Sequence, residues 1–379
     1  MANKLRLAKL ISLCALILLP SKGLAESATP DTSWFEQLLQ DLGASETVDV
    51  SQGIDWGVLP GPFVNPEMGL GLGIAAIGLY GADDWQTGDA ISTLALKGFV
   101  SSNGSYGVGL ENRSYLDGDQ QRILADFWVS KEPKYYYGVG YQQGQNANNE
   151  TLYDALSIKF TPRFAQQILP ETYLIIGWDG QILSQQSFDG PMVPENTATQ
   201  YSSAVVLGVE FDSRDFEPNP YSGRFVQVNY SQFSTAIGSD QNFSQLIGNW
   251  REYYQLSNQD VIATELYIQS LWGDVPWYRL AELGSDKRMR GYYQGQYRDK
   301  QYLSTQIEYR QHLRGRHGVV YWLGAGIIAS SFDQLNEQPI LPNFGIGYRF
   351  SFKSRVNVRL DMGFGRSVSG FYFHINEAF

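Results

Sequence analysis

From about residue 66 to the end of the chain, apolar and polar side chains alternate with a period of two. Residues 356–364, for example, place Arg359 and Asp361 on the face opposite Val358 and Leu360. This is the period of a β-strand, whose successive side chains point to opposite faces. A charge at the middle of a strand costs about 2–4 kcal/mol on the lipid side of a membrane barrel. The charged face therefore predicts either a barrel lumen or the solvent face of a soluble sheet.

The number of such segments separates these two folds. Sixteen are predicted as strands: 66–80, 89–101, 105–116, 120–130, 135–145, 151–163, 171–184, 200–214, 222–235, 242–256, 259–273, 299–314, 317–330, 341–352, 355–366 and 370–379. Tight turns such as 102–104 and 315–316 alternate with longer connections such as 81–88 and 274–298. An even count with this alternation favours an all-β transmembrane antiparallel barrel with short periplasmic turns. A secreted β-sandwich or propeller is the alternative, and segment 135–145 decides between fifteen and sixteen strands.

The N-terminus has the pattern of a signal peptide. A charged region containing Lys4, Arg6 and Lys9 precedes an apolar run at 10–19, and small residues end at Ala25. We therefore expect cleavage after Ala25, so that residues 1–25 are removed. The single cysteine, Cys14, lies inside this segment, so the mature chain has no disulfide and no thiolate metal site. Residues 26–65 are predicted as a short periplasmic lead with one amphipathic helix at 33–42, and residues 66–379 as the barrel.

Charge and composition exclude other classes of protein. The net charge is −11, and removal of the four basic residues of the signal peptide brings it to −15. This argues against a nucleic-acid partner, because binding to phosphates needs clustered cations. No segment after residue 25 approaches 18 consecutive apolar residues, so spanning helices are not predicted. The 24 Tyr and 39 Gly are typical of a barrel in the outer membrane of a Gram-negative bacterium, surrounded by outer-membrane lipid.

The last strand carries a further signal. Phe371, Phe373, Ile375 and the final Phe379 are predicted on one face of segment 370–379. A final aromatic residue on an apolar strand looks like the signal with which the barrel-assembly machinery recognises and inserts outer-membrane proteins. We therefore expect that machinery as a partner during biogenesis.

Segment 283–299 is too polar to be a strand in lipid, yet it is dense in Arg, Gly and Tyr. Its centre, Arg290-Gly291-Tyr292, resembles the loop signature of the BamA/TamA superfamily of outer-membrane barrels, the bacterial surface antigen family. Other matching segments follow the family's order: 66–73, 211–215 with Asn219, Pro220 and Gly223, and 359–365 with the last strand. One departure is Ser285, where the family often has a glycine. The resemblance covers most of residues 60–379.

The resemblance implies that this loop folds into the lumen and that Arg290 meets acidic side chains of the inner wall. Asp361 and Glu308 are the candidates, since both fall on faces that carry charges. Gly291 would allow a positive φ at the tip. The rest of the motif comprises Tyr292, Arg298 and Asp299. The alternative is a solvated outer loop with ordinary charges.

The first and last predicted strands form a candidate lateral seam. Its residues are Gly69, Gly71, Gly73, Phe371, Phe373 and Phe379. Two interpretations stay open. The glycines give either a flexible strand that keeps the lumen side open, or a weakly paired seam that opens sideways to the bilayer.

By resemblance, the protein helps to assemble outer-membrane proteins, or translocates polypeptide or lipid, without covalent chemistry. Unfolded outer-membrane proteins are the expected clients. The periplasmic POTRA module usual in the family is not predicted here, which implies a separate periplasmic partner or a homo-oligomer. A passive pore or structural barrel with the same architecture is the alternative.

An enzyme is not predicted. The three histidines are His312, His317 and His374, and neither a nucleophile elbow nor a His-Glu-x-x-His motif is present. No catalytic, cofactor or metal site is therefore assigned. Several aromatic residues are expected in interfacial belts: Trp272, Trp277, Tyr278, Tyr292 and Tyr293.

Overall fold

The computed structural model describes residue 50 and residues 53–65, 68–81 and 90–379. Two compact units divide after Leu38, and every described residue belongs to the second. The predicted signal peptide (1–25) and the helix expected at 33–42 lie outside the described residues. Within the described part, no helix is both long and apolar enough to cross a membrane.

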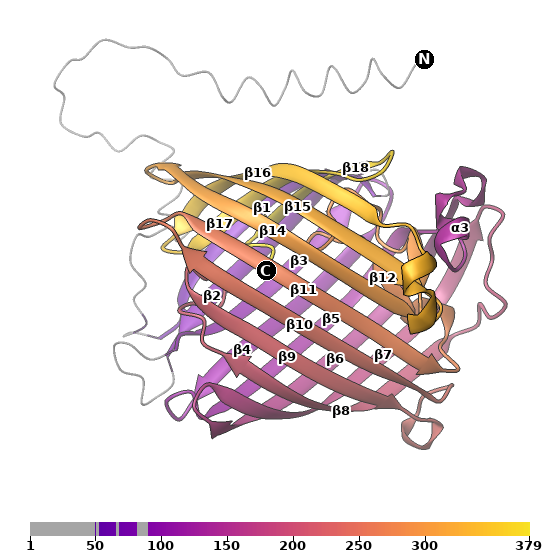
Figure 1. Ribbon diagram of the computed structural model, residues 1–379, viewed down its shortest axis with the longest axis horizontal. Coiled ribbons are helices and arrows are strands. Elements are labelled where there is room, and N and C mark those ends of the chain that lie inside the picture. The colour runs from indigo at the N-terminus through magenta and orange to yellow at the C-terminus, as the bar shows by residue number, and fades with distance from the viewer. Residues whose placement is uncertain (1–49, 51–52, 66–67, 82–89) are drawn as a thin grey trace, which may run out of the picture. The chain divides into compact units, whose positions relative to one another are not determined.

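Sixteen strands form one antiparallel sheet in which neighbours in the chain are neighbours in space (Figure 1). They are β1 (Asp55–Asn65), β2 (Gly69–Tyr80), β3 (Ser92–Ser101), β4 (Tyr106–Leu116), β5 (Gln121–Tyr136), β6 (Thr151–Leu169), β7 (Thr172–Asp189), β8 (Gln200–Asp212), β9 (Gly223–Phe233), β10 (Phe243–Gln255), β11 (Val261–Gly273), β14 (Gln301–Arg314), β15 (His317–Ala329), β16 (Leu341–Lys353), β17 (Val356–Phe364) and β18 (Ser369–Ile375). A separate two-stranded sheet pairs β12 (Ala281–Leu283) with β13 (Tyr297–Asp299). The predicted fold class and strand count are confirmed.

The sheet curls into a barrel whose apolar face points outward. Leu72 on β2 is 65% exposed and Leu323 on β15 is 64% exposed, whereas Arg349 and Arg359 are buried. A soluble sandwich would show the reverse, with charged side chains in water and aliphatic ones in the core. The charged faces predicted from the alternation therefore line the lumen, and the outer face is suited to lipid.

Two errors in the strand prediction cancel in the count. Segment 135–145 is not a strand, because β5 continues to Tyr136 and the chain then turns through Gly138 and Gly140, at φ of 92° and 93°, into α3 (Tyr141–Gln145). The missing strand is β1, inside the segment predicted as a periplasmic lead. Pro60 and Pro62 concealed it, because proline donates no backbone hydrogen bond and is tolerated mainly on edge strands. β1 is such an edge, since β2 is the neighbour with which it pairs.

Because β1 replaces segment 135–145 in the strand count, two early connections belong to the opposite end of the barrel from the one predicted. The loop end carries the long connections 137–150, 190–199, 234–242, 274–300 and 330–340. The turn end carries 117–120, 170–171, 256–260, 315–316 and 354–355, all short, and one longer connection, 213–222. The short turn at 102–105 lies at the loop end, and β2 itself ends at the turn end, opposite to the prediction. Short helices occupy the loop end: α3, η1 (Ala147–Asn149), η2 (Thr235–Ile237), η3 (Trp277–Arg279) and η4 (Phe332–Glu337).

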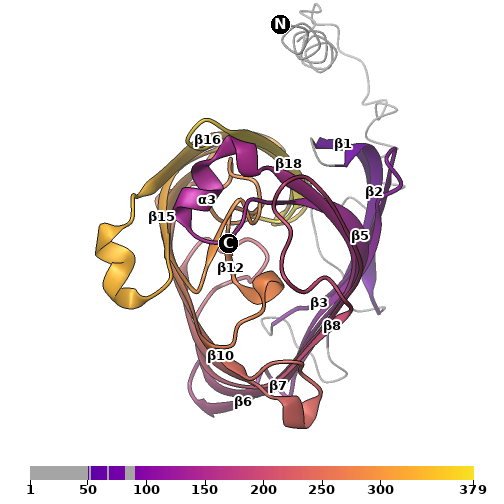
Figure 2. The ribbon, with the colours of Figure 1, turned by 90° about the vertical axis from the view of Figure 1, so that its right-hand side faces the viewer.

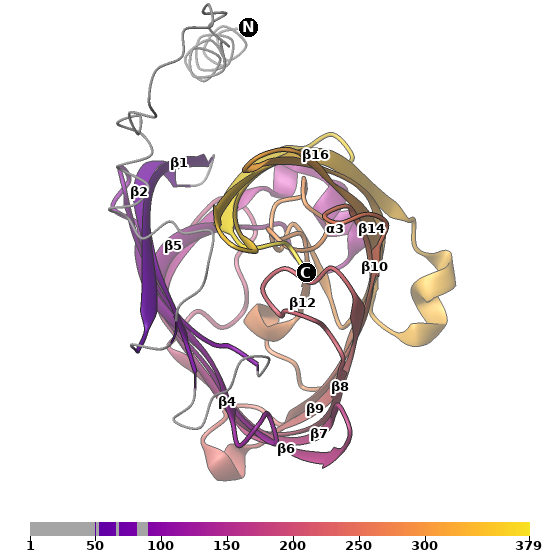
Figure 3. The ribbon, with the colours of Figure 1, turned by 90° about the vertical axis from the view of Figure 1, so that its left-hand side faces the viewer.

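The seam is the junction between the edge strands β1 and β18, and among the described residues no backbone ladder joins them. Leu59 pairs in register with Ala75, on the face of β2 opposite the exposed Ile74, and so points to the lumen side. Yet Leu59 packs against Phe352, which shares a face of β16 with the lipid-exposed Phe344. The inner face of β1 therefore covers the outer face of the C-terminal strands. Figure 3 shows these strands, in yellow, curling inside the first strands.

The last residues leave the wall and enter the lumen. Asn376 has a φ of 68°, which ends the strand conformation, and Phe379 is buried in a cluster with Tyr253 and Val261. Arg310 donates a hydrogen bond of 2.7 Å to the backbone oxygen of Phe379. The prediction that Phe379 shares the outer face of β18 is wrong, because this reversal carries it inward.

Candidate functional site

The candidate site has three parts: the lumen loop, the seam, and a cavity between them. The lumen loop (residues 274–300) connects β11 to β14 and folds back inside the barrel, where Figure 2 shows β12 within the ring of strands. η3 and the β12–β13 pair form its base, and residues 284–296 form its tip. Ser285 Oγ accepts hydrogen bonds from the N–H groups of Lys287 and Arg288, at 3.2 and 2.9 Å, which stabilises the turn into the tip.

Arg290 anchors the tip to the wall. Its side chain is fully buried, Nη1 donates to Asp361 on β17 at 2.6 Å, and Nη2 donates to Glu308 on β14. The guanidinium also lies 3.7 Å from the centre of the Trp322 ring, in a cation–π contact. Burial alone would lower the pKa of Arg290, but the two carboxylates outweigh burial and raise it. The structure thus brings together the arginine and both acidic residues singled out from the sequence.

Gly291 lies where only a glycine fits. Its φ is 112°, and a Cβ built on it would be 2.6 Å from the backbone of Phe364 on β17. Its N–H donates to the hydroxyl of Tyr372 on β18 at 2.9 Å. The neighbouring Tyr292 is buried and donates its hydroxyl to the Pro342 carbonyl oxygen at 2.8 Å. The tip is therefore in direct backbone contact with the strands next to the seam.

Arg298 holds the base of the loop instead. It is fully buried, donates to the carbonyl oxygens of Gly295 and Tyr135 at 3.0 and 3.2 Å, and pairs with Glu282 at 3.2 Å. Asp299 accepts a hydrogen bond of 2.8 Å from the Lys300 N–H. Arg298 therefore supports the loop from within and also ties it to β5, and neither motif residue contacts the wall partners of Arg290.

A larger ionic network surrounds the contacts expected from the sequence. Arg349 and Arg359 both donate to Asp361, at 2.6 and 3.1 Å. A second anchor joins Arg288 of the loop to Glu265 on β11, at 2.7 Å. Alternation places such residues in the lumen, but it does not show which strands face one another across the barrel.

A cavity of about 430 Å³ lies between the seam and the lumen loop. Of the predicted seam residues, Gly73, Phe371 and Phe373 line it; Gly69 and Gly71 do not, and Phe379 lies elsewhere in the lumen. Other apolar and aromatic side chains that line the cavity include Leu59 and Phe99. A cavity lined by both apolar and charged side chains suits an amphipathic occupant.

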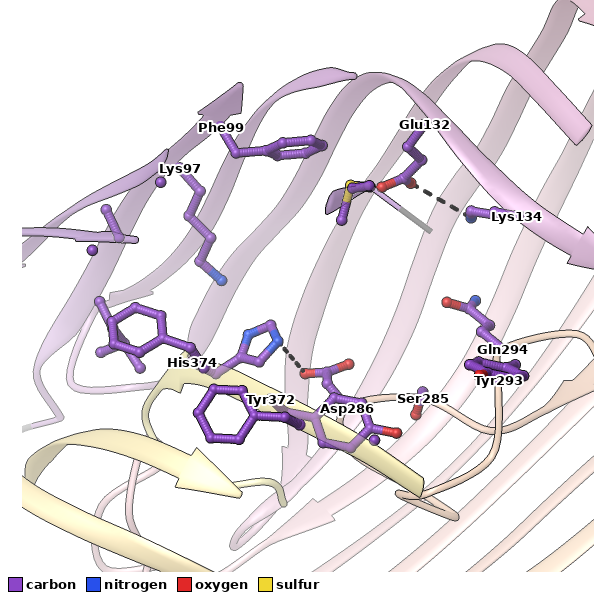
Figure 4. Close-up of a pocket in the computed structure, with 18 of the residues that line it drawn as sticks. Lys97, Phe99, Glu132, Lys134, Ser285, Asp286, Tyr293, Gln294, Tyr372 and His374 are labelled. Atoms are coloured by element: carbon purple, nitrogen blue, oxygen red, sulfur yellow. Dashed lines mark ion pairs between the residues drawn. The ribbon is translucent and has the colours of Figure 1, made fainter. Parts of the chain in front are cut away.

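Charged side chains also line the cavity, as Figure 4 shows. His374 on β18 lies 3.5 Å from Asp286 of the loop, and Lys134 lies 3.6 Å from Glu132. Burial alone would raise the pKa of Asp286, but His374 and Arg359 hold it well below its usual range. Together with the Tyr372–Gly291 hydrogen bond, the His374–Asp286 contact ties β18 to the loop.

The remaining predictions on aromatic residues and histidines are mixed. Trp272 is exposed on β11, but Trp277, Tyr278 and Tyr292 are buried within the loop region, so the belt prediction is wrong for these three. Their aromatic rings fill the space between loop and wall, which a sequence pattern does not distinguish from a membrane interface. His317 hydrogen-bonds to the Tyr348 hydroxyl at 2.6 Å. Among the described residues, no group of three His, Cys, Asp or Glu could hold a metal ion.

Comparison with known proteins identifies the family to which the chain belongs. The Omp85 superfamily domain model matches residues 87–373. BamA from Haemophilus ducreyi lacking POTRA domains 1–3 is 14% identical, with 96% of this chain and 80% of that chain covered and a TM-score of 0.51. CdiB from Escherichia coli is 10% identical, with 85% of this chain and 60% of that chain covered and a TM-score of 0.57. No curated protein matches the chain.

These structural likenesses show the fold alone, and the chain spans about three fifths of the Escherichia coli CdiB chain. The part of the chain that the structure describes contains no POTRA-like module, since every strand except β12 and β13 belongs to the barrel sheet. The family model, by contrast, matches well over half of the chain. The protein is a β-barrel of the Gram-negative outer membrane and belongs to the Omp85 superfamily.

Proposed function

We propose that the protein assists the assembly or translocation of polypeptide at the outer membrane by opening its seam, without covalent chemistry. The observation that carries the proposal is the overlap of β1 with the C-terminal strands. Among the residues that the structure describes, no backbone ladder closes this junction. Opening it requires separating apolar contacts such as Leu59 with Phe352 and one ion pair, Asp55 with Lys353, whereas opening any other neighbouring strand pair breaks a row of backbone hydrogen bonds.

An opened seam presents two strand edges. Unpaired backbone N–H and C=O groups on an edge strand are a template for an added strand. The cavity behind the seam offers apolar and polar walls, which suits a client strand with alternating side chains. Unfolded outer-membrane proteins have this alternation, so they are the clients that we propose.

The lumen loop serves as the fixed side of this mechanism. Arg290 holds the loop to β14 and β17, and Tyr372 and His374 hold β18 to the loop. Movement of β1 would then open the seam while β18 stays in place. A separate periplasmic protein, or a second copy of the chain, would deliver the client.

A disulfide across the overlap tests the proposal. The mature chain is expected to contain no cysteine, so the pair Leu59→Cys with Phe352→Cys would be the sole thiols. Purified protein in liposomes would be assayed for insertion of an unfolded outer-membrane barrel, before and after oxidation. We expect oxidation to abolish the rate enhancement and a reductant to restore it.

The matched control pair is Ala76→Cys with Leu96→Cys, which are direct partners in the β2–β3 ladder. Locking strands that are already paired should leave insertion unchanged. If the oxidised seam pair inserts the client as fast as its reduced form, the proposal is wrong.

A further inference from the structure

A second cavity, of about 460 Å³, lies inside the barrel at the turn end. Four arginines line it, each from a different element: Arg310 from β14, Arg316 from the β14–β15 turn, Arg349 from β16 and Arg355 from the β16–β17 turn. We call it the arginine pocket. Of the side chains that line it, Glu377 is the one carboxylate. Asn258 in a neighbouring turn is exposed, so the pocket is open to solvent at this end.

The arginines are unequally neutralised. Arg349 pairs with Glu377 at 2.7 Å, Arg310 with Glu308 at 3.1 Å, and Arg355 with Asp215 at 2.8 Å. Arg316 donates only to the backbone oxygens of Ser351 and Phe352, at 3.1 and 3.0 Å. Among the described residues, no carboxylate lies within 4.0 Å of it. The pocket therefore carries a cation with no matching anion.

A second observation points to a missing acceptor. Arg349 is 4% exposed, and its Nε and Nη1 atoms both donate to carboxylates. Its Nη2 atom is buried and has no hydrogen-bond acceptor in the protein. Buried donors are nearly always satisfied, and an unsatisfied charged donor is especially unfavourable. An anion in the pocket would supply the acceptor for Arg349 and the counter-charge for Arg316.

We infer that the arginine pocket binds a phosphate-bearing ligand. Guanidinium groups form strong charge-assisted hydrogen bonds with both phosphate and carboxylate oxygens. Here they line one pocket from four separate elements, so a ligand that reaches more than one of them must present acceptor oxygens in several directions. A tetrahedral phosphate does so, whereas a planar carboxylate presents two oxygens in one plane. Amide side chains in the lining, Asn219 and Asn357 among them, could donate further hydrogen bonds.

The site is independent of the proposed seam mechanism, since the two cavities share no lining residue. The phosphate could belong to a soluble compound at the turn end or to the headgroup of a phospholipid. Both sources share the chemistry that the pocket recognises, and an experiment can separate them.

The experiment is a calorimetric titration of the purified full chain in detergent with inorganic pyrophosphate. We expect saturable binding at a single site, weakened about tenfold by Arg316→Gln, because one charge-assisted contact is lost. Arg316 is the residue to change, since its removal leaves no buried carboxylate unpaired. The matched control is Arg314→Gln, which removes the same charge from an exposed residue two positions away that does not line the pocket.

Absence of saturable binding would overturn the inference. An equal loss of affinity in both variants would also overturn it, because it would show only diffuse attraction to positive charge. A short poly-glutamate peptide that binds as tightly as pyrophosphate would overturn the preference for phosphate. Thermal unfolding in nanodiscs with and without phosphatidylglycerol then distinguishes a lipid headgroup from a soluble compound as the source of the phosphate. Stabilisation that depends on this lipid and is lost in Arg316→Gln supports a headgroup; stabilisation by pyrophosphate without it supports a soluble ligand.

Discussion

The lumen loop and the seam line the same cavity, yet they are held by different kinds of interaction. The loop is fixed to the wall by buried ion pairs, with Arg290 at their centre and no exposed surface on its side chain. The seam is closed mainly by apolar side chains and glycines, with one ion pair between Asp55 of β1 and Lys353 of β16, and among the described residues no backbone ladder joins its two edges. Buried charges demand one exact geometry, whereas apolar contacts tolerate sliding. We therefore propose that the cavity has a rigid side, the loop, and a movable side, the seam.

The largest loss of stability is expected from a change in the lumen loop, on the rigid side of the cavity. Arg290→Ala leaves Glu308 and Asp361 buried with fewer partners, and breaking a buried pair in this way costs about 3–5 kcal/mol. We expect a lower unfolding temperature in detergent, altered heat-modifiability on gels and faster proteolysis of the loop. Arg290→Lys, which keeps the charge but not the planar fork, should lose less. Unchanged heat-modifiability together with unchanged protease resistance in the alanine variant would refute the anchoring role.

A smaller effect is expected from Gly291→Ala. The added Cβ would meet the Phe364 backbone at 2.6 Å, and φ of 112° is strained for any L side chain. A loss of about 1–3 kcal/mol follows. The control is Gly104→Ala, whose φ is 86° but whose Cβ would have nothing within 4 Å. If both variants unfold at the same temperature, the close approach between loop and β17 contributes nothing.

The smallest effect on stability is expected on the movable side. The Phe373 ring lies against Gly61 of β1, where an added Cβ would be 2.8 Å away. Phe373→Ala should lower the stability by only about 1 kcal/mol, because the ladder between β17 and β18 remains. It should nevertheless increase the frequency of brief openings in single-channel recordings. Phe344→Ala, on the outer face of β16 between two paired strands, should leave the recordings unchanged.

The recordings also bear on the alternative of a passive pore. A chain plugged by the lumen loop should conduct in brief, irregular events. A large and steady conductance in the unmodified protein would favour the pore and would contradict the role given to the loop.

The sequence predicted the barrel well because alternation is a local signal that repeats in every strand. It failed at β1, where Pro60 and Pro62 break the strand signal, and at 135–145, where two glycines turn the chain after Tyr136. The first failure missed a whole strand, because its prolines hide the strand signal, and the second predicted a strand where turn geometry outweighs periodicity.

The site was only partly predictable, for a different reason. Alternation placed Asp361 and Glu308 inside the barrel, and the structure brings both to Arg290. The Arg288–Glu265 pair and the inward turn of Phe379 were missed. Contacts across a lumen depend on how the loop and the last residues fold back, and no period in the sequence encodes this.

Hydrogen exchange of the backbone amides tests the central contrast most directly. Among the described residues, no ladder joins the seam-facing edges of β1 and β18, whereas β6 and β7 are each paired with a strand on both sides, with bulges only in the β6–β7 ladder. Exchange slows where opening requires breaking hydrogen bonds that other elements share. We predict fast exchange along the seam-facing edges and strong protection in β6 and β7 of the folded protein in nanodiscs. Equal protection of the seam and of these strands would show that the barrel is closed by hydrogen bonds and would contradict the account.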